Sequence, residues 1–187
     1  TKGLDIDWAA LSSEWRDLYR STLDRIIAGQ QPWLRVDRIY RETLDTLFER
    51  RGLSGVFTVA ERDELNQIWT QLDPWPDSVE GLTRLRRRFV TSTLSNAGMA
   101  AVVAVVKHAG LPFDVVLTAE LAHSYKPAPA VYKLAVDHLG YQPDEILMVA
   151  CHKYDLRAVR TFGMRTAFVA RSLEFGPSAK PDTAPET

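Results

Sequence analysis

Three segments of the sequence carry polar side chains in the region that follows a short apolar run. The first is Leu94-Ser95-Asn96, where a hydroxyl, an amide and backbone N–H groups come together. Groups of this kind at the start of a helix bind anions such as a carboxylate. Ser95 or Asn96 could equally be the N-cap of a helix, and the sequence leaves both roles open.

The second segment has a lysine among prolines, in Tyr125-Lys126-Pro127-Ala128-Pro129. Proline is accepted in the first turn of a helix, so we expect Lys126 at a helix start with its ammonium held in one direction. Such a lysine keeps a neighbouring carboxylate ionised, although an isolated surface lysine is only solvated. Tyr132 follows within the same helix, either near the lysine or packed in the core.

The third segment is Cys151-His152-Lys153-Tyr154-Asp155, where an apolar run ends in ionisable side chains. Asp155 is the carboxylate of this segment, and it either takes part in chemistry or caps the next helix. Cys151 and His152 together could form a thiol nucleophile or a metal site. Neighbouring side chains on extended backbone point in opposite directions, so we disfavour both of these interpretations.

The elements that must position these groups fall into two classes, and the first part of the chain shows only helical spacing. Apolar residues recur every three or four positions, which predicts helices over residues 8–27, 36–48 and 59–72. Asp7 is the expected N-cap of the first helix, and Thr58 with Glu61 is expected to form a capping box before the third. The prolines of residues 73–78 then interrupt the pattern, as in a hinge or linker.

After this interruption, apolar runs alternate with helical stretches. The apolar runs predict buried strands over residues 89–94, 113–117, 146–151 and 166–169. The helical stretches cover residues 99–109, 128–139 and 156–162, followed by Gly110, Gly140 and Gly163. This alternation predicts a parallel sheet, and side chains that follow parallel strands meet at its carboxyl edge. We therefore expect Lys126 and Asp155 within ion-pair distance.

The composition restricts the class of protein and its partners. With 187 residues, of which 45% are hydrophobic, the chain can form one core with a smaller lobe. The 23 basic and 24 acidic residues nearly cancel, so no broad field attracts nucleic acid or an acidic membrane surface. The single cysteine excludes an internal disulfide and favours a cytoplasmic location, and no apolar run reaches the ~20 residues of a membrane helix.

Taken in order, the three segments resemble the second, third and fourth motifs of the haloacid dehalogenase superfamily. The matching segments are Leu94-Ser95-Asn96, Tyr125-Lys126-Pro127 with Tyr132, and residues 149–155. Residues 73–77 and 162–169 are further similar to the 2-haloacid dehalogenase branch. The resemblance covers nearly the whole chain.

This resemblance implies an α/β fold, a Rossmann-like parallel sheet core with an inserted helical cap domain. It assigns residues 1–76 to the cap and residues 77–171 to the core. Residues 172–187 are rich in proline, serine, alanine and threonine and are expected to be a mobile tail.

The resemblance also implies an activity, the hydrolysis of the carbon–halogen bond of small 2-haloacids. In this family an aspartate displaces halide, and water then cleaves the resulting ester. Lys126 would hold that aspartate ionised, and Asp155 would orient Lys126 or the water. Ser95 and Asn96 are implied as catalytic residues that also bind the substrate carboxylate.

Further substrate-binding residues are implied around this set. Arg16, in a Trp15-Arg16 pair like that of the family's cap, would hold the substrate carboxylate or the departing halide. Tyr132, His152 and Tyr154 complete the implied substrate site. A small 2-haloacid is the expected partner, with no cofactor, no nucleic acid and no membrane, and a homodimer is left open.

The choice of branch depends on the place after the fourth strand. Phosphatases of the superfamily usually carry a Gly-Asp pair there that supports Mg²⁺, whereas this chain reads Ala150-Cys151-His152. We therefore expect no metal and favour dehalogenation over the first alternative, a Mg²⁺-dependent small-molecule phosphatase. The second alternative is a non-catalytic relative that binds a small acid or a protein.

The chain departs from the family pattern in three ways. Residues 1–187 contain no Asp-x-Tyr-Gly-Thr or Asp-x-Phe-Gly-Thr segment, so the nucleophilic aspartate is expected to be missing and the chain alone to be inactive. Because the nucleophile strand is central in the family, strands 89–94 and 146–151 are not expected to pair directly. His152 stands where dehalogenases often have Asn, and Ala97 where a Gly is usual.

Overall fold

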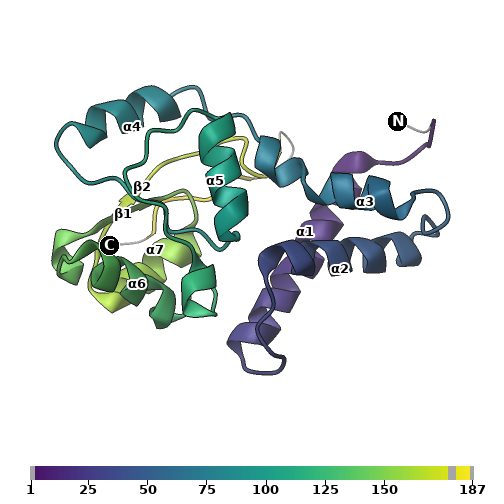
Figure 1. Cartoon of the computed structure of the whole chain (residues 1–187), viewed down its shortest axis with the longest axis horizontal. Helices are drawn as coiled ribbons and strands as arrows, with labels where there is room; N and C mark the ends of the chain where they lie inside the picture. Colours follow the sequence, from purple (N-terminus) through teal and green to yellow (C-terminus); the bar gives the residue numbers. More distant parts are fainter. Residues whose placement is uncertain (1–2, 177–179, 186–187) are drawn as a thin grey trace. The chain divides into compact units, whose positions relative to one another are not determined.

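The computed structural model describes residues 3–176 and 180–185 of the chain. Helices occur throughout these residues, and the second half also contains a parallel sheet (Figure 1). The predicted α/β class is thereby confirmed. The chain divides into two compact units, Thr1–His123 and Ser124–Thr187.

The first unit opens with helical elements. These are α1 (Trp8–Ile27), α2 (Val36–Arg50), α3 (Val59–Asn66) and the 3₁₀ helix η1 (Ile68–Gln71). Asp7 caps α1 as predicted, since its carboxylate accepts a hydrogen bond from the Ala10 N–H at 2.9 Å. The predicted capping box of Thr58 and Glu61 is present at α3. The helix expected over residues 59–72 is divided, because the backbone tightens to 3₁₀ geometry after α3.

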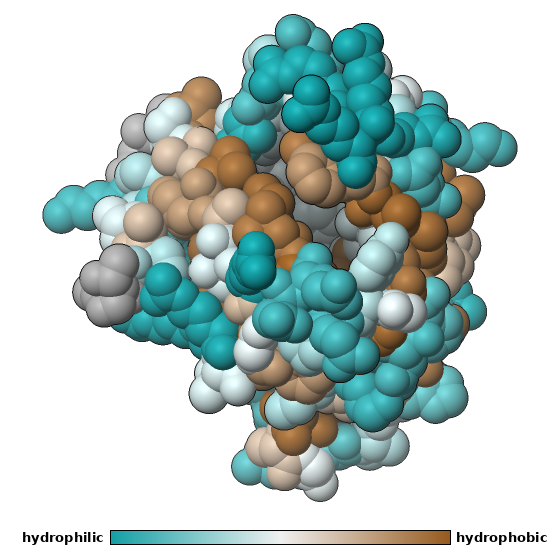
Figure 2. All heavy atoms as spheres, turned by 90° about the vertical axis from the view of Figure 1, so that its left-hand side faces the viewer, coloured by the Kyte–Doolittle hydropathy of each residue, from teal (hydrophilic) through white to brown (hydrophobic). Residues whose placement is uncertain are grey.

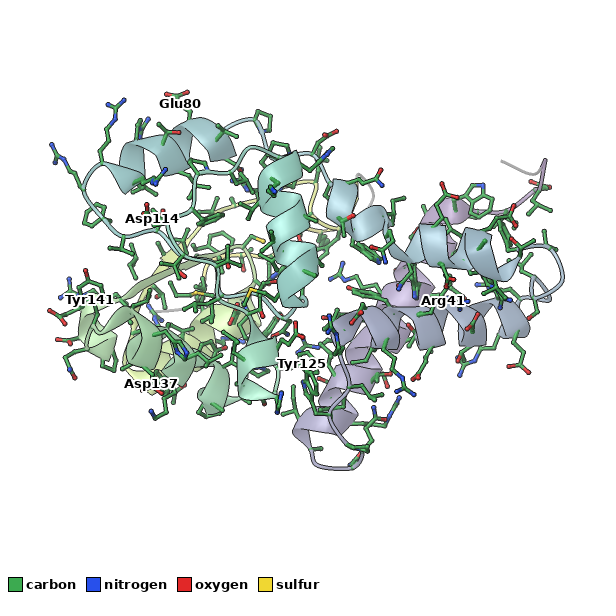
Figure 3. All side chains as sticks on the ribbon, in the orientation of Figure 1. Arg41, Glu80, Asp114, Tyr125, Asp137 and Tyr141 are labelled. Carbon is green, nitrogen blue, oxygen red and sulfur yellow. The ribbon has the colours of Figure 1, made fainter. Side chains whose placement is uncertain are left out.

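Apolar faces hold α1, α2 and α3 together. Trp15 is 6% exposed and belongs to a core cluster with Leu11, Leu44, Leu47 and Phe48. Its indole Nε1–H donates to the Tyr40 carbonyl oxygen at 2.9 Å, so the polar atom of the buried ring has a partner. Arg41 of α2 reaches Asp63 of α3 at 2.7 Å and adds an ion pair between these two helices (Figure 3).

The remaining helical elements of this unit are α4 (Ser78–Arg86), α5 (Met99–His108) and the 3₁₀ helix η2 (Ala119–Ala122). Helix α5 was predicted, and it packs against η1. Helix α4 is absent from the sequence predictions. None of its residues is fully buried, although Val79, Leu82 and Leu85 recur every three positions along it.

The strands expected over residues 89–94 and 113–117 do not form a continuous ladder. Two isolated parallel bridges stand in their place, Ser92 with Val115 and Ser95 with Thr118. Between them the Thr93 hydroxyl accepts the Leu117 N–H at 3.1 Å and donates to the Leu117 carbonyl oxygen at 2.9 Å. In a regular ladder the Leu117 N–H would bond to the Thr93 carbonyl oxygen. Here it bonds to the Thr93 hydroxyl instead, and this interrupts the ladder.

The second unit is a strand–helix–strand arrangement preceded by a helix. Its elements are α6 (Pro129–Leu139), the 3₁₀ helix η3 (Pro143–Glu145), β1 (Leu147–Ala150), α7 (Lys153–Phe162) and β2 (Arg165–Phe168). The two strands pair in parallel, with Leu147 opposite Arg165. Gly140 and Gly163 end α6 and α7 with φ values of 73° and 97°, a left-handed conformation that favours glycine. The strands and helix ends predicted here are confirmed.

Several large apolar side chains remain exposed. Phe89 and Val90 are 64% and 51% exposed, and Leu147 and Val149 of β1 are 55% and 48% exposed. Figure 2 shows hydrophobic residues, in brown, beside hydrophilic residues, in teal, on the face in view. The expectation of complete burial is therefore wrong for these four residues. Among residues 3–176 and 180–185, none of the helices has both the length and the apolar character needed to cross a membrane.

The predicted tail, residues 172–187, lies partly outside the described residues, at 177–179 and 186–187. Its described part makes contacts within the second unit. The Asp182 carboxylate accepts a hydrogen bond from the Lys153 N–H at 2.7 Å, and Glu174 lies 3.1 Å from His152. The mobility of this tail, like the assignment of residues 1–76 to a cap and 77–171 to a core, stays a prediction.

Candidate active site

A buried carboxylate, Asp155, organises the polar residues of the second unit. Its side chain is 1% exposed, and Lys126 Nζ donates to its Oδ2 atom at 2.5 Å. The Tyr132 hydroxyl donates to the other oxygen, Oδ1, at 2.7 Å. The predicted ion pair between Lys126 and Asp155 is confirmed, and Tyr132 belongs to the same network.

Two helix starts bring these three side chains together. Ala128 is the N-cap of α6 and Pro129 its first residue, so Lys126 lies just before the helix and Tyr132 lies near its beginning. Asp155 lies in the first turn of α7, whose N-cap is His152. The interpretation of Asp155 as an N-cap is therefore wrong. At the positive end of a helix macrodipole, a carboxylate is stabilised in its charged form.

The network defines what its members can do chemically. Both oxygens of Asp155 hold hydrogen bonds, so its charge is balanced where water has little access. Lys126 donates to Asp155 and its side chain is 12% exposed, so it is a fixed, partly buried cation beside this carboxylate.

Ser95 and Asn96 lie in the first unit, before α5. The Ser95 hydroxyl accepts a hydrogen bond from the Ala97 N–H at 3.1 Å and closes a short turn there. Neither residue caps α5, because its N-cap is Gly98. The Ser95 backbone also pairs with Thr118, whose buried hydroxyl has no hydrogen-bond partner among the described residues.

A carboxylate that the sequence analysis missed reaches the start of α5. Glu120 Oε2 accepts a hydrogen bond from the Met99 N–H at 2.6 Å, and its Oε1 lies 3.4 Å from the Arg35 guanidinium. Only the folded chain brings Glu120 to this helix, so no local pattern marked it. Glu120 thus occupies the Met99 N–H at the start of α5, and the anion site expected at Ser95 and Asn96 stays a prediction.

Arg16 is exposed on α1, directly after the buried Trp15. The burial of Trp15 against α2 fixes the face of α1 on which Arg16 lies. Arg16, Ser95 and Asn96 belong to the first unit, whereas Lys126, Tyr132, His152, Tyr154 and Asp155 belong to the second. The structure brings Lys126, Tyr132 and Asp155 into contact, and a common substrate site for all eight residues stays a prediction.

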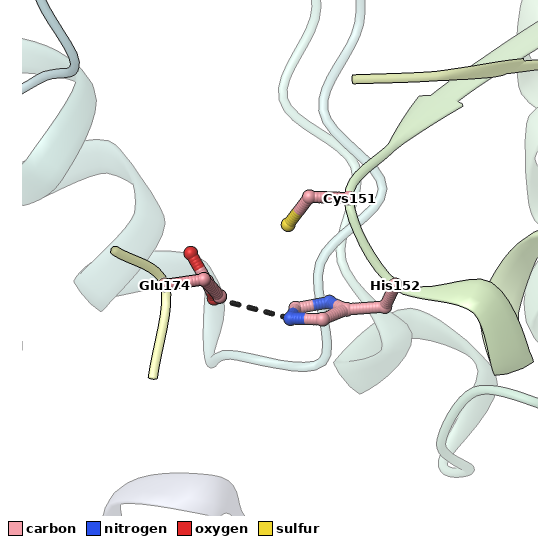
Figure 4. Close-up of side chains that lie close together, drawn as sticks. All are labelled: Cys151, His152 and Glu174. Carbon is pink, nitrogen blue, oxygen red and sulfur yellow. Dashed lines mark hydrogen bonds and ion pairs between the residues drawn. The ribbon is translucent and has the colours of Figure 1, made fainter. Parts of the chain in front are cut away.

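A second cluster lies beside this network, at the end of β1. Cys151, His152 and Glu174 point toward one another, and the His152 Nε2 atom lies 3.1 Å from Glu174 Oε1 (Figure 4). Hydrogen bonds to Cys151 and then to Glu174 raise the pKa of His152 to about 9, so the imidazole is charged at neutral pH. Tyr154 stacks on the same ring, with centroids 5.8 Å apart.

This cluster corrects the expectation that the Cys151 and His152 side chains point apart. The strand ends at Ala150 and the chain bends at Cys151, so the alternation of an extended strand no longer applies. Glu174 was missed because it comes from the loop after β2, far along the sequence. A glutamate within a proline-containing segment carries no local signal of such a contact.

Comparisons with known proteins agree with the geometry. Residues 4–150 match the family described as haloacid dehalogenase-like hydrolase. The chain is 30% identical over 181 residues to (S)-2-haloacid dehalogenase 4A of Burkholderia cepacia, a match covering 90% of this chain and 75% of that protein. It is 34% identical over 157 residues to the (S)-2-haloacid dehalogenase of Pseudomonas sp. (strain YL), covering 82% and 63%.

Solved structures extend the likeness to three dimensions. The L-2-haloacid dehalogenase PA0810 has a TM-score of 0.92 and 38% identity, with 98% of this chain and 80% of that chain covered. The defluorinating L-2-haloacid dehalogenase Rha0230 has a TM-score of 0.93 and 34% identity, with 98% and 76% covered. The chain therefore belongs to the haloacid dehalogenase-like hydrolases.

Proposed function

We propose that this hydrolase acts on small 2-haloacids and replaces the halogen with a hydroxyl group. The observation that carries the proposal is the buried network in which Lys126 and Tyr132 bind Asp155. The relatives from Burkholderia cepacia and Pseudomonas are named for (S)-2-haloacids, which favours that enantiomer. The chain spans 63% of the length of the Pseudomonas relative, so its activity and substrate are proposals here.

The proposed reaction has two steps. A carboxylate oxygen attacks the carbon that bears the halogen, a C–O bond forms, and halide leaves with the electron pair of the broken bond. Water then attacks the ester carbonyl, which releases the 2-hydroxyacid and restores the carboxylate. In-line displacement inverts the carbon and ester cleavage does not touch it, so an (S)-substrate yields the (R)-product.

The residues of this chain take different parts in the proposed reaction. Lys126, held by Asp155, keeps the attacking carboxylate ionised. Ser95 and Asn96 bind the carboxylate of the substrate, and Arg16 approaches from the cap to hold that carboxylate or the halide. Asp155 itself is not the nucleophile, because both of its oxygens already accept hydrogen bonds. The attacking aspartate comes from the motif that residues 1–187 lack.

The test is halide release by the complete protein from (S)- and (R)-2-chloropropionate, with and without a chelator. We expect release from the (S)-substrate that the chelator does not reduce. We expect Arg16→Ala to lower kcat/KM about 10²–10³-fold, the usual loss of one charge-stabilising donor. Arg38→Ala is the matched control, since Arg38 is exposed on the neighbouring helix α2 and pairs only locally with Glu42.

Lys126→Met should abolish turnover while Lys133→Met, on the exposed face of α6, should not. Loss of Lys126 also leaves Asp155 buried without its cation, so folding of each variant is checked by circular dichroism.

Phosphate release that requires Mg²⁺, with no halide release, would replace this proposal with the phosphatase alternative. Binding of a haloacid without turnover would replace it with the non-catalytic one. The cytoplasmic location and a homodimer stay predictions.

A further inference from the structure

Three side chains with different donor atoms meet at the end of β1. The Cys151 sulfur, a His152 ring nitrogen and a Glu174 carboxylate oxygen all lie within 4.8 Å of one another (Figure 4). Each of these residues is half-buried. The proposed dehalogenation gives these three side chains no joint role, and no metal site was expected from the sequence.

We propose that Cys151, His152 and Glu174 bind a divalent transition-metal ion of the zinc type. Thiolate sulfur, neutral imidazole nitrogen and carboxylate oxygen are the donors that Zn²⁺ takes in proteins, so the ion would displace the proton that His152 carries at neutral pH. Co²⁺ accepts the same ligands, whereas Mg²⁺ and Ca²⁺ prefer oxygen alone. The site is thus chemically distinct from the magnesium site of phosphatases.

The distances fit such an ion after a small adjustment of side chains. Tetrahedral zinc with S, N and O ligands places neighbouring donor atoms about 3.4–3.6 Å apart. The His152 Nε2 and Glu174 Oε1 atoms are already 3.1 Å apart, and all three donors lie within 4.8 Å. Rotation of half-buried side chains closes the remaining gap, and water takes the fourth position.

The backbone explains why these residues can share an ion. Cys151 directly follows β1, and His152 is the N-cap of α7. Glu174 comes from the turn that follows β2, the parallel neighbour of β1. A metal ion would therefore fasten the loop after β2 to the end of β1, close to the turn of α7 that carries Asp155.

The experiment uses Co²⁺ as the probe, because tetrahedral Co²⁺ bound to a thiolate absorbs in the near ultraviolet through charge transfer. Cys151 is the only cysteine of the chain, so this band reports on one sulfur. We expect one equivalent of Co²⁺ to produce the band, Zn²⁺ to displace it, and Zn²⁺ to raise Tm. The absorption band does not depend on halide release, so it tests the metal site even if the protein proves to have no dehalogenase activity.

Variants separate this site from unspecific binding. Cys151→Ser should lose the band. Loss of a residue that only supports a metal ligand usually weakens metal affinity ~10–100-fold, so Glu174→Gln and His152→Asn, which remove ligands, should weaken it by more than that. His108→Asn is the matched control, since it removes a histidine of the other unit that also lies close to a carboxylate, Asp73, at 3.6 Å. Each variant is first shown to be folded by far-ultraviolet circular dichroism.

Two results would overturn the proposal. One is a wild-type protein that shows no charge-transfer band at excess Co²⁺. The other is a folded Cys151→Ser or Glu174→Gln variant that binds Co²⁺ and Zn²⁺ with wild-type affinity. Either result would leave the cluster as a hydrogen-bonded contact between the loop and the strand end.

Discussion

Asp155 has each carboxylate oxygen bound to a different donor, and this makes it sensitive to single changes. Lys126 supplies an ionic partner to Oδ2, and Tyr132 supplies a neutral hydroxyl to Oδ1. Because Asp155 and Tyr132 are both 1% exposed, water cannot easily replace a lost donor. The two contacts can be tested separately, since Tyr132 carries no charge.

We expect Tyr132→Phe to lower the free energy of unfolding by about 1–3 kcal/mol, the cost of leaving a buried acceptor without its donor. The ring stays in place, so the change reports on the hydroxyl. Tyr141→Phe is the control, because Tyr141 is 41% exposed and its loss should change stability by less than about 0.5 kcal/mol. Urea unfolding of the two variants measures both values, and equal stabilities would contradict the role given to Tyr132.

Some of these residue contacts could be predicted from the sequence and others could not. The ion pair of Lys126 and Asp155 was predicted, and the structure forms it at the starts of α6 and α7. Glu174 and Glu120 make contacts that depend on how distant loops return to a helix start. The residue types around each glutamate do not indicate which distant helix start its carboxylate reaches.

At the scale of elements, Asp114 joins α4 to the segment after it. Its Oδ2 atom accepts hydrogen bonds from the Thr91 N–H at 3.0 Å and the Thr91 hydroxyl at 2.9 Å, and Oδ1 pairs with Arg86. The Thr91 N–H, followed by the Arg86 guanidinium, holds the pKa of Asp114 below its usual value. The connection is therefore strongest when Asp114 is ionised.

The sign of the pH effect follows from this lowered pKa. The stabilisation by Asp114 is complete above the unfolded pKa of about 3.9 and is lost as pH falls through the lower folded pKa. We expect Asp114→Asn to be less stable than wild type at neutral pH, with a difference that shrinks below about pH 4. Unfolding curves against pH measure this, and the same curves of wild type give the reference at each pH. A constant difference at all pH values would exclude the ionic contribution.

The sequence predicted helices better than strands, for a physical reason. A helix such as α1 or α7 satisfies its own backbone, so its apolar spacing and its caps suffice to mark it. A strand depends on a partner, and the pairing of residues 91–95 with 114–119 is altered by one hydroxyl, that of Thr93. Helix α4 was missed because it begins directly after the prolines that indicated a linker, although Val79, Leu82 and Leu85 have helical spacing.

At the scale of the whole molecule, one edge of β1 raises the question of a missing neighbour. The carbonyl groups of Ile146 and Ala150 accept hydrogen bonds from the β2 side, at 3.0 Å each. Since the backbone direction alternates along a strand, the N–H and C=O groups of Leu147 and Val149 face the opposite edge. The nucleophile strand that the family resemblance implies is central in the sheet, and whether it lies against this edge stays a prediction.

We expect the free edge of β1 to accept a further strand, because Leu147 and Val149 are 55% and 48% exposed and their N–H and C=O groups face away from β2. A synthetic strand peptide that ends in an Asp-x-Tyr-Gly-Thr segment should bind the chain, raise its Tm and slow hydrogen exchange at the Leu147 and Val149 amides. The Met148 and Ala150 amides face β2 and serve as the internal control, with little change. A peptide with the same composition in scrambled order should have no effect. Slow exchange at Leu147 and Val149 without any peptide would show that another segment already pairs with this edge, and the fold would then have adapted to the absence of the nucleophile strand.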